Sequence, residues 1–186
     1  MYWLDNESEP ARRMGAVLDK SGVSLSLADA RLDDAPLIGV NTAFCNMTGY
    51  TAEQVLGRNC RFLQPGGGAG PVRERMRSFI ADDQLTEGKF VVPNVRADGT
   101  PFLNLVYMSK LKFDGKVAYI LGSQFEIVRH DDKALGLYEM ALQQDIRQLR
   151  LVAGEMGMVM LGTFGQLASS HSIIAEMRLS DERGDR

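Results

Sequence analysis

Two Asp-Gly pairs, Asp98-Gly99 and Asp114-Gly115, constrain the fold of this chain more than any other feature. They separate three runs rich in β-branched and aromatic residues, at 90–96, 101–111 and 117–128. Asp-Gly between apolar runs is a strong hairpin signal, because both residues accept the positive φ angles of tight turns. The sequence therefore predicts three consecutive antiparallel strands.

The N-terminal part predicts a helix and a further hairpin. Residues 1–20 have helical spacing and end at a turn. Residues 23–28 alternate with a period of two, and residues 36–40 form a short apolar run after a turn-rich segment. Two strands are expected to open the sheet.

Short helices are expected between the two groups of strands. One covers residues 44–47, and another follows Thr51, which can act as an N-cap with Gln54 at the third helical position. The glycine-rich segment 65–71 is predicted to be a flexible connector, because no Gly-Lys-Ser/Thr of a phosphate-binding loop follows it. A longer helix is predicted at 72–82.

The sequence after His130 has helical spacing. Apolar residues recur in alternating steps of three and four, at Leu135, Tyr138, Leu142, Ile146, Leu149, Val152, Met156, Val159 and Met160. Glycines between 154 and 165 predict two helices joined there. The second helix, at about 166–177, carries a stripe of its own with Leu167, Ile173, Ile174 and Met177. A single domain of this size could hardly bury both apolar stripes, so we expect a homodimer through these helices.

Composition restricts the class of protein. The 186 residues are long enough for one domain with an appendage, and a net charge of -3 gives no positive field for nucleic acid. The N-terminus lacks a secretory signal and no apolar stretch is long enough to span a membrane, so we expect a cytoplasmic protein. Two cysteines, Cys45 and Cys60, are too few for a disulfide framework and lack zinc-site spacing, so no metal is expected.

Three side-chain amides are expected on one sheet face. Turns centred on the Asp-Gly pairs place Asn94 nearly opposite Asn104, and Asn104 beside Phe125, next to Gln124. With a register error of about one residue, the three even-numbered positions share a face. Burial of three amides is costly unless a buried partner pairs with them, and a planar heterocycle with carbonyl and N–H groups suits them. The alternative is that one or more of them faces solvent or a neighbouring loop.

The octapeptide Gly57-Arg-Asn-Cys-Arg-Phe-Leu-Gln64 resembles a signature of the light-oxygen-voltage (LOV) branch of the PAS domain family. The resemblance extends over 22–128 and includes the segments 41–50, 96–104 and 122–124. It implies an α+β PAS/LOV fold, with a five-stranded antiparallel sheet and short helices on one face. We therefore assign 1–20 to an N-terminal helical cap, 21–128 to a flavin-binding domain and 129–186 to a C-terminal helical extension.

The resemblance also implies a cofactor and a photoreactive thiol. The cofactor is expected to be FMN, because the loop after Gln64 lacks the insertion of the family's FAD binders. Cys60 would bond reversibly to C4a of the flavin under blue light. Arg61 and Arg77 would pair with the phosphate, a role for which Arg75 competes with Arg77.

The remaining site residues follow from the same resemblance. Asn59 and Gln64 would contact the ribityl group and the pyrimidine side of the ring, and Asn94 with Asn104 would hold its polar edge. Gln124 would rotate its amide when the ring nitrogen N5 becomes a donor.

The resemblance implies a blue-light photoreceptor rather than an enzyme. Its signal is expected to pass through the sheet to the C-terminal helices, to dimer packing or to a downstream signalling protein. The alternatives are a light-insensitive PAS sensory or dimerisation module that binds another ligand, and a flavin oxidoreductase, for which no nicotinamide site is recognisable. A cysteine hydrolase is disfavoured, because His130 and His171 lie outside the domain that carries Cys60.

Overall fold

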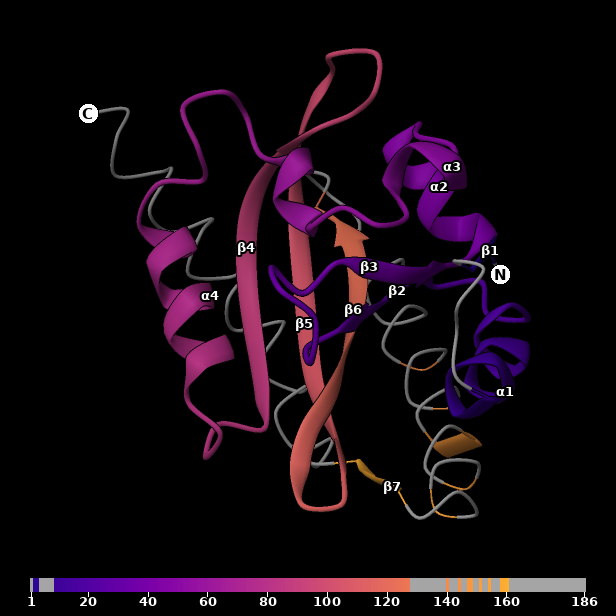
Figure 1. Ribbon diagram of the computed structural model, residues 1–186. Coiled ribbons are helices and arrows are strands. Elements are labelled where there is room, and N and C mark those ends of the chain that lie inside the picture. Colours follow the sequence, from indigo (N-terminus) through magenta and orange to yellow (C-terminus); the bar gives the residue numbers. More distant parts are fainter. Residues whose placement is uncertain are drawn as a thin grey trace.

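The protein is built on one antiparallel sheet, seen in the computed structural model of Figure 1, which describes residues 2–3, 9–127 and 158–160 and positions 140, 144, 147, 148, 151 and 154. Five strands form its main part, in the order β3-β2-β6-β5-β4. They are β2 (Ser24–Asp29), β3 (Leu37–Val40), β4 (Glu87–Val95), β5 (Pro101–Phe113) and β6 (Lys116–Glu126). The three predicted strands around the Asp-Gly turns are confirmed as β4, β5 and β6, and the predicted N-terminal hairpin as β2 and β3.

Two short strands extend this sheet where no strand was predicted. β1 (Tyr2–Trp3) pairs with the outer edge of β3, and β7 (Met158–Met160) pairs with the end of β5 that β4 does not reach. The predicted N-terminal helix is correspondingly shorter and is found as α1 (Glu9–Leu18). Pro10 fits the first turn of this helix, where its missing N–H has no helical partner to lose, and the aromatic pair before it favours a strand. Most of the predicted C-terminal helices lie outside the described residues.

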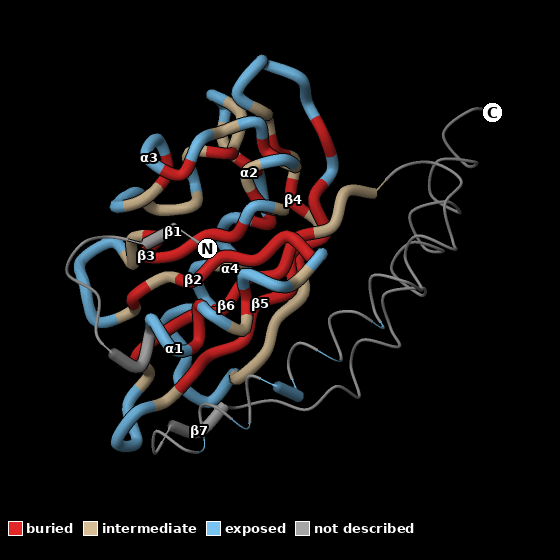
Figure 2. The backbone as a smooth tube through the Cα atoms, turned by 90° about the vertical axis from the view of Figure 1, so that its right-hand side faces the viewer, coloured by how far each residue is buried: buried red, intermediate tan, exposed pale blue. Residues whose placement is uncertain are grey.

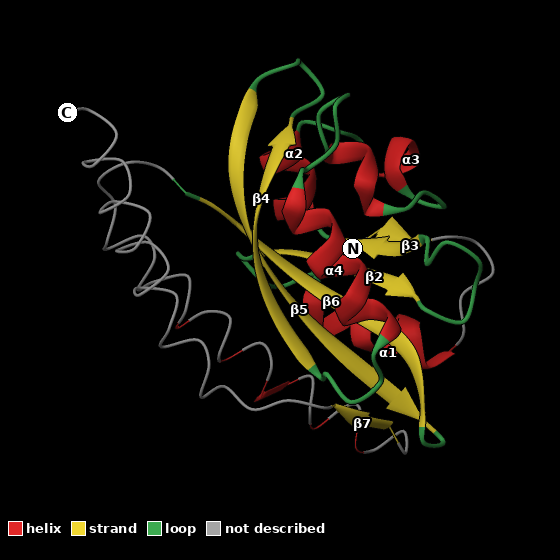
Figure 3. Ribbon diagram, turned by 90° about the vertical axis from the view of Figure 1, so that its left-hand side faces the viewer, coloured by secondary structure: helices red, strands yellow, loops and turns green. Residues whose placement is uncertain are grey.

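Short helices cover one face of the sheet, as predicted (Figure 3). They are α2 (Thr42–Thr48), α3 (Ala52–Val55), the 3-10 helix η1 (Cys60–Leu63) and α4 (Pro71–Ala81). The capping box that Thr51 and Gln54 predicted is present, with the Thr51 N–H donating to Gln54 Oε1 at 2.9 Å. Among the described residues, no helix is long and apolar enough to cross a membrane.

The strand register differs by one residue from the register that turn centring predicts. Asn104 lies opposite Val92 on β4 and opposite Glu126 on β6. The β4–β5 connection is a five-residue loop with Asp98 at its centre, so the turn is wider than an Asp-Gly pair. On the other side, the pairing shifts at Leu111, and Ala118 is the extra residue of a bulge. Both shifts change the register by one and leave the three amides on a shared face.

Buried positions run along the strands of the sheet (Figure 2), and two clusters of buried side chains among the described residues lie on that face. One joins α4 to β4, β5 and β6, and the other joins α2, α3 and η1 to β3. Lys110 is fully buried beside the first cluster, and its ammonium donates to the carbonyls of Phe79 (2.7 Å) and Asp82 (2.8 Å) at the end of α4. A cation at a helix C-terminus satisfies carbonyls that have no helical partner. This lysine therefore holds α4 against the sheet.

Asn41 joins the first strands to the first helices. Its Oδ1 accepts from the N–H groups of Leu25 (3.0 Å) and Phe44 (2.9 Å). This oxygen therefore caps α2 and joins the helix to β2. Its Nδ2 donates to the carbonyls of Val23 (2.7 Å) and Leu18 (3.3 Å), the last residue of α1. The side chain is fully buried, so no water can replace these bonds.

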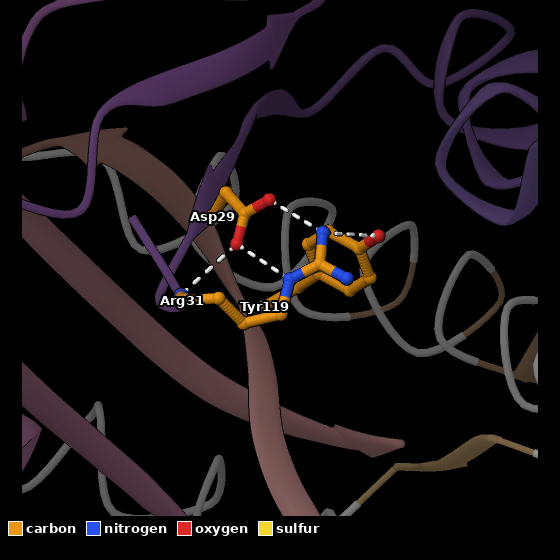
Figure 4. A network of polar contacts seen from close by, with 3 residues as sticks. All are labelled: Asp29, Arg31 and Tyr119. Atoms are coloured by element: carbon orange, nitrogen blue, oxygen red, sulfur yellow. Dashed lines mark hydrogen bonds and ion pairs between the residues drawn. The ribbon is translucent and has the colours of Figure 1, made fainter. Parts of the chain in front are cut away.

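A charged network holds the end of β2 against β6 (Figure 4). Asp29 lies opposite Tyr119 in the strand register, and the guanidinium of Arg31 donates to both Asp29 (2.5 and 2.9 Å) and the Tyr119 hydroxyl (3.0 Å). The Arg31 hydrogen bonds lower the pKa of Asp29, although burial acts in the opposite direction and is the largest single contribution. The network is on the sheet face opposite the three amides.

Candidate functional site: a cavity between the sheet and the helices

A cavity of about 400 Å³ lies between the amide-bearing face of the sheet and the helices. Pockets of this size are typical of small-molecule and cofactor sites. Much of its wall is apolar and comes from both layers: Leu37, Leu63, Met76, Val92, Val106, Met108 and Ile120. The polar lining includes the amides on the sheet, a thiol on η1 and arginines on η1 and α4. The described residues contain no cluster of His, Cys, Asp or Glu that could hold a metal ion.

All three predicted amides line this cavity and are buried. Asn94, Asn104 and Gln124 expose 4%, 1% and 4% of their surface, so the solvent-facing alternative is wrong. Asn104 Nδ2 donates to Asn94 Oδ1 at 2.9 Å, and Asn94 Nδ2 donates to the carbonyl of Pro93 at 3.0 Å. Asn104 Oδ1 is buried and finds no hydrogen-bond partner in the described part of the protein. An unpaired buried carbonyl costs about 1–3 kcal/mol, so this atom indicates a donor on a ligand.

Pro93, which has no backbone N–H, lies on an edge strand of the sheet. β4 is the last strand of the sheet path, and Pro93 lies opposite Leu103 without a break in register. Proline on an edge strand leaves no interior ladder bond unmade. The adjacent Asn94 can therefore face the cavity.

Gln124 is held by two serines of the neighbouring strand. Ser24 Oγ donates to Gln124 Oε1 at 3.1 Å, and Gln124 Nε2 donates to Ser26 Oγ at 2.9 Å. Gly122 provides the necessary space, since a Cβ there would lie 2.9 Å from Ser26 Oγ and 3.0 Å from Gln124 Nε2. In the structure Gly122 lines the cavity and also makes room for this amide contact.

Cys60 opens η1 and lines the cavity from the helical side. Asn59 fixes the start of η1, because its Oδ1 accepts from the Arg61 N–H at 3.0 Å. Burial raises the pKa of the Cys60 thiol to about 12, although the residue keeps part of its surface open. The open part is consistent with its place in the cavity wall. At neutral pH the group is therefore a thiol and not a thiolate.

Three arginines lie at the cavity lining, and two of them already have acidic partners. Arg61 forms a two-pronged ion pair with Asp34, which lowers the pKa of that carboxyl, and Arg77 pairs with Glu74 at 2.9 Å. Arg73 lies one helical turn before Arg77, on the same side of α4. No hydrogen-bond or ion-pair partner of the Arg73 guanidinium is found among the described residues.

The predicted site residues are thus brought together around one cavity. Asn59, Cys60, Arg61, Gln64, Arg77, Asn94, Asn104 and Gln124 all contribute to its lining. Arg75, the competitor of Arg77, does not. The Asn59 amide donates to the carbonyl of Asp34 at 2.5 Å, so its geometry is that of a loop anchor at the cavity. Sequence reasoning missed Ser26, Asp34 and Arg73, although helical spacing from Arg77 could have indicated Arg73.

The residues fit a flavin on three independent grounds. The unpaired Asn104 Oδ1 can accept from an N–H at the edge of a planar ring. The apolar side chains of both layers can enclose an aromatic ring system. The arginines offer planar forks suited to a phosphate.

Comparison with known proteins identifies the family of this fold. The sequence profile of the PAS domain family matches residues 31–129, more than half of the sequence. The chain belongs to this family. A solved structure of the Rhodobacter sphaeroides LOV protein matches this PAS domain with a TM-score of 0.69 and 35% identity, covering 76% of this chain and 83% of that one. The protein is therefore a PAS domain of the LOV branch, and the predicted resemblance is confirmed.

Curated relatives agree with this placement. The sequence is 33% identical over 148 residues to the White collar 1 protein of Neurospora crassa, covering 73% of this chain and 12% of that protein. It is 35% identical over 125 residues to blue-light-activated histidine kinase 1 of Erythrobacter litoralis, covering 66% of this chain and 34% of that protein. This PAS domain therefore corresponds to a minor part of each of these relatives.

Proposed function

We propose that this protein is a blue-light receptor that holds FMN in the cavity beside Cys60. The observation that carries the proposal is the arrangement of a protonated thiol on η1 across the cavity from three buried amides, one of which has an unpaired carbonyl. Similarity to LOV proteins and blue-light-activated kinases supports a light-sensing function and a flavin cofactor.

The bound flavin would supply absorption of blue light and an electrophilic ring carbon, C4a. Cys60 would supply the sulfur for a reversible bond to that carbon and the proton that ring nitrogen N5 would take up. The raised pKa of Cys60 supports this role, because the residue must deliver a proton as well as sulfur. Asn94 and Asn104 would hold the polar edge of the ring. Gln124 would present its amide to ring nitrogen N5, which would change from a hydrogen-bond acceptor to a donor.

The arginines would bind the phosphate of FMN. Arg61 and Arg77 can exchange their exposed carboxylate partners for a phosphate, since such surface pairs are worth little. Gln64 would contact the ribityl group, and Asn59 would do so while anchoring Asp34. The connection between η1 and α4 spans only 64–70 and leaves no inserted segment for the second nucleotide of FAD.

The decisive experiment is the absorption spectrum of the purified protein. A yellow protein that bleaches in blue light and recovers in darkness is expected, and Cys60→Ala should abolish the bleaching while retaining the colour. Cys45→Ala is the matched control, because Cys45 is the second free cysteine and is absent from the cavity lining. Bleaching that persists unchanged in Cys60→Ala would refute the proposed bond. Colourless protein would favour the alternative, a light-insensitive PAS module with another ligand or none.

The output would pass through the sheet to the segment 129–186 and change the packing or affinity of a homodimer. In this proposal the protein acts as a sensory module, with the predicted organisation into 1–20, 21–128 and 129–186. A downstream signalling protein is the remaining candidate recipient. Sedimentation of dark and illuminated protein tests the dimer hypothesis, and identical profiles with unchanged crosslinking would contradict it.

A further inference from the structure

The contacts of Gln124 define a polar clamp, which consists of Ser24, Ser26 and the Gln124 amide. Ser24 lies directly opposite Gln124 across the β2–β6 ladder, and Ser26 lies opposite Gly122. The three side chains expose at most 6% of their surface, so their hydrogen bonds have no water to replace them. Each end of the amide contacts one hydroxyl, at 3.1 and 2.9 Å.

The two serines differ in their position relative to the cavity. Ser26 lines it and Ser24 does not. The Gln124 Nε2 group is therefore directed to the cavity side, and Oε1 is directed away from it. In this orientation the amide offers a donor to the cavity, which is what an unprotonated ring nitrogen needs.

A hydroxyl can donate one hydrogen bond and accept others, and its proton rotates freely. Ser24 now donates to Oε1, and Ser26 now accepts from Nε2. After rotation of the amide by half a turn, Nε2 would donate to Ser24 and Oε1 would accept from Ser26. Both orientations would keep two hydrogen bonds to β2, because each serine only exchanges its role.

We infer that Ser24 and Ser26 are positioning residues that hold the Gln124 amide in both of its orientations and exchange donor and acceptor roles when it rotates. This inference rests on the proposed function, since the rotation is driven by the change at N5. It adds that the change reaches β2 through two hydroxyls. It also assigns the orientation in the structure to the dark state.

Gly122 and Asn41 allow β2 to respond to a rotation of the Gln124 amide. Gly122 leaves the gap in which Ser26 Oγ and Gln124 Nε2 meet, and any side chain there would lie within about 3 Å of both. Asn41 binds the backbone of Val23 and Leu25, the residues on either side of Ser24. The clamp therefore acts on a segment whose backbone is tied directly to α1 and α2.

The test is the light-minus-dark infrared spectrum of the 186-residue protein with its bound flavin. The carbonyl bands of the Gln124 amide are assigned as those lost in Gln124→Leu. Ser24→Ala should move the dark-state band to higher wavenumber and leave the lit-state band in place, because Ser24 donates to Oε1 only in the dark. Ser26→Ala should do the reverse. Circular dichroism establishes that both variants are folded, and Ser109→Ala, a buried serine of β5 absent from the cavity lining, serves as the control.

The outcomes separate this inference from the proposed function. The crossed pattern of shifts supports the clamp. Shifts of the same band in both variants, shifts in neither, or the reversed pattern would overturn it while the bleaching of the wild-type protein still upheld the photoreceptor. A wild-type protein without any light-induced spectrum would overturn the proposed function and the clamp together.

Discussion

Replacement of Asn41 by alanine should remove a large part of the stability of the domain. The side chain makes one N-cap bond to Phe44, one bond to the N–H of Leu25 and bonds to the carbonyls of Val23 and Leu18. All of these groups belong to buried residues, and these residues lie where α1, β2 and α2 meet. Alanine at position 41 would leave the N–H groups of Leu25 and Phe44 unpaired where water cannot reach, and the Val23 carbonyl would lose its bond of 2.7 Å, whereas the Leu18 carbonyl keeps the N–H of Ser21 at 3.2 Å.

The magnitude follows from the individual bonds. Loss of an N-cap costs about 1 kcal/mol. A buried N–H or C=O left without a partner costs about 1–3 kcal/mol, and the change creates at least two such groups, at Leu25 and Val23. The sum is about 3–7 kcal/mol, a large fraction of the roughly 5–15 kcal/mol by which domains are stable.

Urea unfolding followed by circular dichroism measures this loss. Asn46→Ala is the matched control, because Asn46 is exposed on the same helix, and its free energy of unfolding should stay within about 0.5 kcal/mol of the wild type. The slope of the transition should be unchanged, since the surface exposed on unfolding is the same. A loss below about 1 kcal/mol in Asn41→Ala would refute the reasoning that Asn41 is the junction of these elements.

Three further predictions concern charge and protonation. The light-induced bleaching should be constant from pH 7 to 10, because the raised pKa of Cys60 keeps the thiol protonated there. The thiol should ionise only as the pH rises towards about 12, and loss of bleaching with a midpoint near the ordinary thiol pKa of 9.0 would contradict this. Lys110→Met should speed hydrogen exchange of the amides in the last turn of α4, whereas Lys116→Met, at an exposed site, should not. Arg73→Ala should weaken the binding of FMN about tenfold and leave the binding of riboflavin unchanged, with Arg75→Ala as the control. An equal loss of affinity for both flavins would show that Arg73 does not contact the phosphate.

The parts of the fold that sequence reasoning predicted are those with local causes. Asp-Gly turns, alternating strands and the Thr51 capping box each depend on neighbouring residues, and each is found at or near its expected place. The shared face of Asn94, Asn104 and Gln124 also follows from strand periodicity. The match of Cys60 and its neighbours to the family signature predicted a thiol at the flavin site, and Cys60 lies in the wall of the same cavity as the amides.

The parts that were missed depend on contacts between distant segments. The ion pair of Arg61 joins it to Asp34, which has a positive φ angle in a loop far from it in sequence. Ser24 and Ser26 alternate like any strand residues, and only the pairing of β2 with β6 brings them to Gln124. The strands β1 and β7 are too short for any periodic signal.

The bulge at Ala118 has a consequence for how the β5–β6 hairpin tolerates insertions and deletions. The tip at Asp114-Gly115 lies outside the paired region that faces the cavity, so changes in its length leave the orientation of later residues intact. Deletion of Ala118 would remove only the extra residue, so Tyr119 would stay opposite Leu111 and Gln124 opposite Val106. A single deletion at Leu121, in the regular part of the ladder, is different, because it would turn every later residue of β6 to the opposite face. Gln124 would then face away from the cavity and Ser123 or Phe125 would face it, so one codon in this hairpin decides whether the domain can sense a ligand at all.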